Sequence, residues 1–141
     1  MFESIINAET VQAYMETEYR VLGDAPFVIR VSERCPELAA AHKRHRVDCS
    51  AFITACNPLS QALDDLANAE RHAALGRELR QRSLAFVEGV GQHTSNQWPG
   101  EISFLVLGLT LEAAKTLGSR WEQNAIIWIG GDAVPQLILL R

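Results

Sequence analysis

The order of secondary-structure patterns after residue 47 most strongly constrains the fold of this 141-residue chain. Short apolar runs typical of strands and longer amphipathic patterns typical of helices follow one another as strand, helix, strand, strand, helix, strand. This order predicts an α+β domain with a ferredoxin-like βαββαβ core, in which two right-handed crossovers interlock within one sheet. A single domain over residues 1–141 is expected, with residues 1–46 as an N-terminal addition and residues 47–141 as the core.

The boundaries of the core elements follow from turn and cap residues. The expected strands cover residues 47–56, 84–88, 102–107 and 125–129; the expected helices cover 68–83 and 110–121; a closing hairpin strand covers 134–140. Asn68 and Thr110 are the predicted N-caps of the two helices. Gly89 and Gly91 are expected to loosen the end of the second strand.

The N-terminal addition is predicted to form a helix, a strand and a second helix. The first helix begins after Asn7 and ends at Gly23, and the strand covers residues 27–31. Pro36 suits the first turn of the second helix, over residues 37–46, whose basic end agrees with the helix dipole.

The strand over residues 47–56 ends at Asn57-Pro58. Proline disfavours a helical conformation in the preceding residue, so we expect Asn57 to be extended, with its side-chain amide available. The crossovers bring this strand end beside the start of the next helix and the starts of the strands at 102–107 and 125–129. The predicted ligand-binding residues at this end are Asn57, Asn68, Arg71, Ser103, Gln123 and Asn124.

A helix N-terminus beside Arg71 favours negative charge, because unpaired backbone N–H groups and the guanidinium both attract anions. We therefore expect a small anionic or nucleotide-like ligand there, with Trp98 near the rim. Glu101 is the candidate catalytic acid or base if the protein is an enzyme, or a simple ion-pair partner of Arg71. Each of these residues also has an ordinary role in a turn, a cap or a strand.

Other chemistries have weaker signals. His42 and His45 lack the spacing of a known zinc motif and are expected on a solvated helix face, so no metal site is predicted. Gly89-Val90-Gly91 does not lead into a helix, which argues against a dinucleotide site, and no cofactor is expected. Cys56 is expected to be a small buried hydrophobe rather than a nucleophile.

Net charge and cysteine content indicate which partners and which cellular compartment to expect. The formal net charge of −4 argues against a nucleic-acid-binding protein, which would concentrate positive charge. The three cysteines form no CxxC pair, no apolar run is long enough to span a membrane, and the opening Met1-Phe2-Glu3 is unlike a signal peptide, so a cytoplasmic protein is expected.

Two other roles stay open. The apolar residues 137–140 suit a homodimer or a protein-interaction module. The basic helix, through Lys43, Arg44 and Arg46, suits RNA, with a steep salt dependence.

Four blocks of sequence resemble a known family. They are Ser50-Ala-Phe-Ile-Thr-Ala-Cys-Asn-Pro-Leu-Ser60, Asn68-Ala-Glu-Arg71, Glu101-Ile-Ser-Phe-Leu-Val-Leu-Gly-Leu109 and Gln123-Asn-Ala-Ile-Ile127. Over about Val47 to Leu140 the chain is similar to the bacterial family catalogued as domain of unknown function 3293. Cys56 stands where that pattern more often has an aromatic residue. The resemblance implies a small bacterial cytoplasmic protein of unassigned activity.

Overall fold

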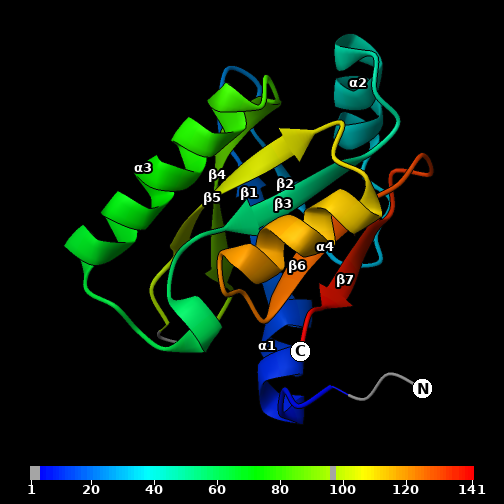
Figure 1. Ribbon diagram of the computed structural model, residues 1–141. Helices are drawn as coiled ribbons and strands as arrows, with labels where there is room; N and C mark the ends of the chain where they lie inside the picture. Colours follow the sequence, from blue (N-terminus) through cyan, green and yellow to red (C-terminus); the bar gives the residue numbers. More distant parts are fainter. Residues whose placement is uncertain (1–3, 96–97) are drawn as a thin grey trace.

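The structure is a computed structural model that describes residues 4–95 and 98–141. Within these residues the chain forms a mixed α/β fold of four α-helices, one short 3-10 helix and seven strands (Figure 1). The strands are β1 (Thr17–Val21), β2 (Phe27–Ile29), β3 (Ser50–Thr54), β4 (Ala85–His93), β5 (Glu101–Leu107), β6 (Ala125–Ile129) and β7 (Pro135–Leu139). The helices are α1 (Ala8–Glu16), α2 (Pro36–His45), the 3-10 helix η1 (Pro58–Ser60), α3 (Asp65–Gln81) and α4 (Leu111–Arg120).

All seven strands belong to one antiparallel sheet with the order β2-β1-β4-β5-β3-β6-β7. β5 and β6 flank β3 and each runs antiparallel to it, so β5 and β6 are parallel to each other, as the predicted crossovers require. The register places Thr54 opposite Ser103, which brings the end of β3 beside the start of β5.

Helices α3 and α4 cover one face of the sheet (Figure 1). Leu75 and Leu79 of α3 and Leu117 of α4 are fully buried there. They pack in one cluster with Phe104 and Ile53, which alternate in β5 and β3 with residues of the opposite face. The layer between these helices and the sheet is therefore built around an apolar cluster.

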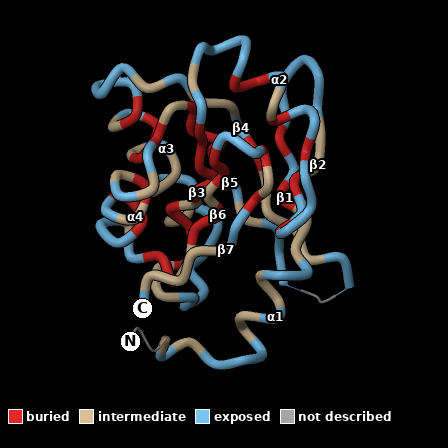
Figure 2. The backbone as a smooth tube through the Cα atoms, turned by 90° about the vertical axis from the view of Figure 1, so that its right-hand side faces the viewer, coloured by how far each residue is buried: buried red, intermediate tan, exposed pale blue. Residues whose placement is uncertain are grey.

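The opposite face, called the enclosed face below, lies inside the curl of the sheet. The two sheet edges meet at one end of it, because the amide of Ser32 donates to the Pro135 carbonyl at 2.8 Å and the amide of Cys35 to the Ala133 carbonyl at 2.9 Å. Helix α2 fills this end with Leu38, which is fully buried. Helix α1 lies at the other end of the molecule and contributes no buried residue (Figure 2).

The predicted first helix was too long. Helix α1 ends at Glu16 and the chain continues as β1, which pairs with β2 and β4. The residues Thr17, Tyr19 and Val21 alternate with polar ones, and Tyr19 and Val21 are buried. Pairing on both sides of this β-branched and aromatic segment outweighs its helical spacing.

Two further local predictions were wrong. β4 runs through Gly89 and Gly91 to His93, and Gly89 is needed inside the strand because a Cβ there would lie 2.6 Å from the Phe52 ring. Helix α3 starts three residues earlier than predicted, capped by Asp64, whose side chain accepts from the Ala67 amide at 2.7 Å. Asn68 lies inside the helix.

The basic helix α2 matches its predicted bounds closely, with Arg46 as a left-handed C-cap. His42, however, is buried rather than solvated, and its Nε2 lies 2.7 Å from the Ser50 hydroxyl. The prediction for Met1-Phe2-Glu3 lies outside the described residues. No helix in the described ranges has the length and hydropathy needed to cross a membrane.

Candidate functional site

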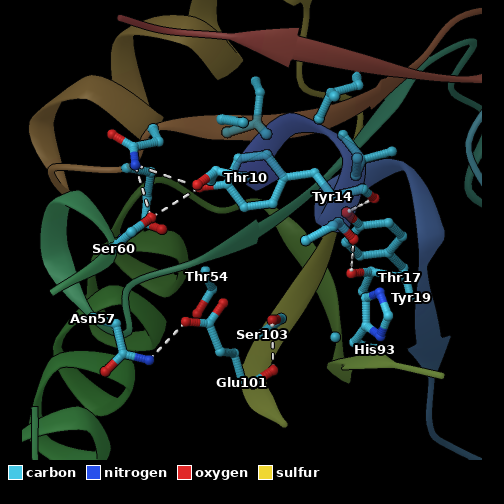
Figure 3. A pocket seen from close by; sticks show the side chains of 18 of the residues that line it. Thr10, Tyr14, Thr17, Tyr19, Thr54, Asn57, Ser60, His93, Glu101 and Ser103 are labelled. Carbon is cyan, nitrogen blue, oxygen red and sulfur yellow. Dashed lines mark hydrogen bonds between the residues drawn. The ribbon is translucent and has the colours of Figure 1, made fainter. Parts of the chain in front are cut away.

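A pocket of about 350 Å³ lies between α1 and the enclosed face, at the end away from α2 (Figure 3). Five strands supply most of its wall: β1, β3, β4, β5 and β6, joined by Leu137 of β7. The curl of the sheet brings these strands around the space, and α1 lies across it. Segments from both ends of the sequence therefore meet in one cavity.

Five of the seven residues predicted for the site line this pocket: Asn57, Glu101, Ser103, Gln123 and Asn124. They converge because β3 ends where β5 and β6 begin, as the crossover argument predicted. Asn68 and Arg71 are not among the lining residues. Asn68 lines a smaller hollow of about 240 Å³ on the other side of Asn57, together with Trp98 and Ile102.

Asn57 organises the turn that ends β3. Its backbone is left-handed (φ 47°, ψ 65°), so the prediction of an extended residue was wrong; asparagine tolerates this conformation better than most residues. The backbone N–H of Asn57 donates to Asn68 Oδ1, and the side-chain Nδ2 of Asn68 donates to Asn57 Oδ1, both at 2.9 Å. Asn57 Oδ1 also accepts from the Leu63 amide at 2.9 Å. The two asparagines thus clamp the loop between β3 and α3.

Arg71 of α3 also stabilises the start of this loop. Its Nε donates to the Ala55 carbonyl at 2.5 Å and its Nη2 to the Trp121 carbonyl at 2.8 Å. Its Nη1 lies 3.6 Å from a carboxylate oxygen of Glu122, so the ion-pair partner of Arg71 is Glu122 rather than Glu101. Asp64 and Asp65 stand at the N-terminus of α3. These two carboxylates carry negative charge at the start of α3, and the role of Arg71 in ligand binding stays a prediction.

Glu101 faces the pocket from the first position of β5. Its Oε2 accepts from Asn57 Nδ2 at 2.7 Å (Figure 3). Burial raises the pKa of the Glu101 carboxyl, and hydrogen bonds from the side chains of Asn57 and Trp98 oppose that rise. A carboxyl of this kind can accept or release a proton nearer to neutral pH than an exposed one.

Helix α1 supplies the opposite wall, which the sequence reasoning did not include. The Tyr14 and Ser60 hydroxyls share a hydrogen bond of 2.8 Å. Asn124 Nδ2 donates to the Ser60 hydroxyl at 2.7 Å, and Arg141 donates to Asn124 Oδ1 at 3.0 Å. Tyr14 therefore ties α1 to the loop after β3 and to the start of β6.

β1 and β4 add Thr17, Tyr19 and His93 to the lining. The Tyr19 hydroxyl donates to the Tyr14 carbonyl at 2.7 Å, and His93 Nε2 lies 2.9 Å from Glu16 Oε1. Sequence reasoning missed these residues because it placed 17–22 in a helix and ended β4 early. The alternation of Thr17, Tyr19 and Val21 was the signal that could have revealed them.

Cys56 is 2% exposed and burial raises the pKa of its thiol. Its Sγ donates to the Ile102 carbonyl at 3.5 Å. A buried thiol of this kind is poorly suited to nucleophilic attack, which needs the thiolate. In the described part of the chain, no group of three or more His, Cys, Asp or Glu residues is arranged to hold a metal ion.

Comparison with known families gave a match. Residues 53–126 match the model of a family described as a protein of unknown function, DUF3293. The match covers 74 of the 141 residues, from the second half of β3 to the start of β6. All seven residues predicted for the site lie within the matched range. Comparisons with curated proteins and with solved structures found no match.

Proposed function

This chain belongs to the DUF3293 family, and we propose that it binds a small molecule in the pocket between α1 and the enclosed face. The observation that carries the proposal is the convergence of polar side chains on a cavity of about 350 Å³ that also has an apolar wall. Ligand sites of proteins are typically concave, largely apolar and supplied with a few polar groups that fix orientation.

The two walls differ in chemistry. The side of β3 and β5 presents Thr54, Glu101 and Ser103, whereas β6 and β7 present Ile127 and Leu137. A ligand with a polar edge and an apolar body would satisfy both walls. A nucleobase-like ring is one such shape, and the aromatic side chains of the lining suit it.

The loop after β3 supports the same proposal. Asn57, Leu59 and Ser60 all have positive φ, at 47°, 55° and 62°. A left-handed conformation is unfavourable for leucine, and such strain is found where a structure needs a particular shape of loop. Here the loop delivers Asn57 and Ser60 to the pocket wall.

The finer description of the fold is also a proposal. We assign β4, β5, β3 and β6, with α3 and α4 on one face, to the ferredoxin-like class. Their order in the sheet and the two crossovers support this assignment. β1, β2 and β7 then extend the sheet at both edges, and residues 1–46 join the core in one domain because β1 pairs with β4.

The test is a thermal-shift screen of purified protein against nucleosides, amines, carboxylates and phosphorylated metabolites. Ala13 lines the pocket from α1, so Ala13→Phe should fill part of the cavity. Ala8 is exposed on the same helix outside the pocket, which makes Ala8→Phe the matched control. At a hundred times its dissociation constant, a ligand of the folded state should stabilise the protein by about 2.7 kcal/mol.

We expect compounds that raise the melting temperature of the wild type and of Ala8→Phe, but not of Ala13→Phe. Shifts that persist in Ala13→Phe would place the binding elsewhere and contradict the proposal. If no compound acts, the interaction module becomes the better hypothesis. Its own signature is loss of self-association when Leu137 or Leu139, both half-buried in the edge strand β7, is made charged. An RNA-binding role would instead show steep salt dependence and sensitivity at Lys43, Arg44 and Arg46.

A further inference from the structure

We infer that the ligand of this pocket is a small organic cation, an amine or amidinium on an apolar or aromatic body, with Glu101 as its counter-ion. The inference rests on the proposed function, because it names the chemical class for the same pocket. It reverses the sign of charge expected from the sequence, where Arg71 beside a helix start suggested an anion.

The charges around the pocket carry the first step. Glu9 and Glu101 line it, and among the described lining residues there is no lysine or arginine. The described lining residues also include one histidine, His93. Its Nε2 is directed to Glu16. A bound anion would therefore face carboxylates without a guanidinium or ammonium to balance it, which is unfavourable in a partly desolvated site.

Two arginines that contact the walls of the site, Arg71 and Arg141, donate to other groups. Arg71 donates to the carbonyls of Ala55 and Trp121. Arg141 donates to Asn124 Oδ1, which orients the Asn124 amide with its nitrogen toward Ser60. Both cations thus stabilise the framework of the pocket rather than its interior.

Glu101 is held in place as an acceptor. Asn57 Nδ2 donates to its Oε2, and Asn57 is itself fixed by the Leu63 amide and by Asn68. Neutral amide and indole donors orient the carboxylate without cancelling its charge. The positive charge that a buried carboxylate favours is therefore left for the ligand to supply.

Aromatic rings form the second part of the argument. Tyr14, Tyr19, Phe52 and Trp98 all line the pocket. Tyr19 and Phe52 meet edge to face, with ring centroids 5.4 Å apart. Figure 3 shows Tyr14 across the pocket from Glu101. Aromatic faces attract cations, and a carboxylate among several rings is the lining that recognises ammonium groups.

The experiment uses three probes of nearly equal shape: benzylamine, benzyl alcohol and benzoate. Each is titrated into the full-length protein at neutral pH and moderate salt, and the dissociation constant is measured from backbone amide NMR shifts. The wild type, Glu101→Gln and Glu112→Gln are compared. Glutamine keeps the hydrogen-bond acceptor for Asn57 but removes the charge, whereas Glu112 is an exposed carboxylate on α4, away from the pocket.

We expect the wild type to bind benzylamine about tenfold more tightly than benzyl alcohol and to bind benzoate most weakly. Glu101→Gln should weaken benzylamine about tenfold and leave benzyl alcohol unchanged, and Glu112→Gln should behave as the wild type. Shifts should centre on the amides near Tyr14 and Ser103.

The inference is overturned if benzoate binds as tightly as benzylamine, if Glu101→Gln keeps the preference for the amine, or if none of the three probes binds. The proposed function is judged separately, by compounds whose stabilising effect disappears in Ala13→Phe. A nucleoside or carboxylate that passes that test while benzylamine fails would keep the pocket as the site and reject the cationic class.

Discussion

The two ends of the enclosed face are built from the same strands but are finished in opposite ways. At the α2 end, Ile29, Leu38 and Ile129 are all fully buried and the edges of the sheet are joined by backbone hydrogen bonds. At the α1 end, the covering helix has no buried residue, and polar side chains surround a cavity. One end therefore closes the sheet, and the other keeps a space inside it.

The change occurs within single strands. β5 presents Leu107 and Leu105 toward α2, and then Ser103 and Glu101 toward α1. β6 stays apolar through Ile127 and Ile129 along the same direction. The polar residues at one end cost stability that apolar side chains would supply, which is the pattern expected where a fold keeps a site. Substituting side chains at each end separately tests this difference.

The largest effect is expected from Leu38→Ala at the closed end. Leu38 is fully buried in α2, and its truncation should reduce the free energy of unfolding by about 3 kcal/mol, because it leaves a cavity as well as losing apolar burial. Val11→Ala in α1 is the matched truncation at the open end, where the side chain is only half-buried. Chemical denaturation of both variants measures the difference. Equal losses would show that the two ends contribute alike.

The next largest effect concerns the loop that forms the pocket wall. Arg71→Ala removes a cation that donates to the carbonyls of Ala55 and Trp121, and we expect a loss of about 2 kcal/mol. Arg77→Ala, an exposed arginine of the same helix, should change stability by less than about 0.5 kcal/mol. If Arg71→Ala kept wild-type stability and lost only ligand affinity, Arg71 would be the anion clamp that the sequence suggested.

The sequence predicted the middle of the fold well. The crossovers from β3 to β4 and from β5 to β6 follow from the order of patterns, and Thr110 caps α4 as predicted. Because these crossovers fix which strand ends meet, the sequence alone places Asn57, Glu101 and Gln123 together. Such long-range information came from topology, not from any motif at those residues.

The remainder depended on interactions that a local pattern does not contain. The alternation of Thr17, Tyr19 and Val21 is a strand signal, but it is short and competes with helical spacing; β1 is a strand because β2 and β4 pair with both of its edges, and those partners are not visible in residues 17–21. The side-chain partner of Asn68 is Asn57, eleven residues away, so its role as a helix cap was the wrong local inference. Missing β1 also hid the wall formed by α1, which is why Tyr14 was absent from the predicted site.

A smaller effect is expected at the tie between α1 and the rest of the pocket. Tyr14→Phe keeps the ring and removes the hydroxyl that bonds Ser60, which should cost about 1 kcal/mol. Because α1 has no buried residue, the loss should appear mainly as faster hydrogen exchange of the α1 amides. Exchange in α2 should be unchanged. Uniformly faster exchange in both helices would mean that α1 is not a separately attached element.

The smallest effect is expected in the pH dependence of stability. Burial raises the folded-state pKa of Glu101 above its ordinary value of 4.5. At a pH between the unfolded-state pKa and the higher folded-state pKa, the folded protein holds a proton that the unfolded chain has lost. The contribution of Glu101 to stability therefore falls as pH rises through this range. Glu16 and Glu18 act in the opposite direction, because hydrogen bonds lower the pKa of both carboxyls and stability is lost on acidification.

The contribution of Glu101 is isolated as the difference in unfolding free energy between the wild type and Glu101→Gln, measured from pH 4 to pH 8. This difference should decrease with rising pH, and by more than the corresponding difference for Glu112→Gln. A difference that grew with pH would show that the Glu101 carboxylate is stabilised in the folded protein. The hydrogen bonds from Asn57 and Trp98 would then outweigh burial, and the contrast between the open end and the closed apolar end would need another explanation.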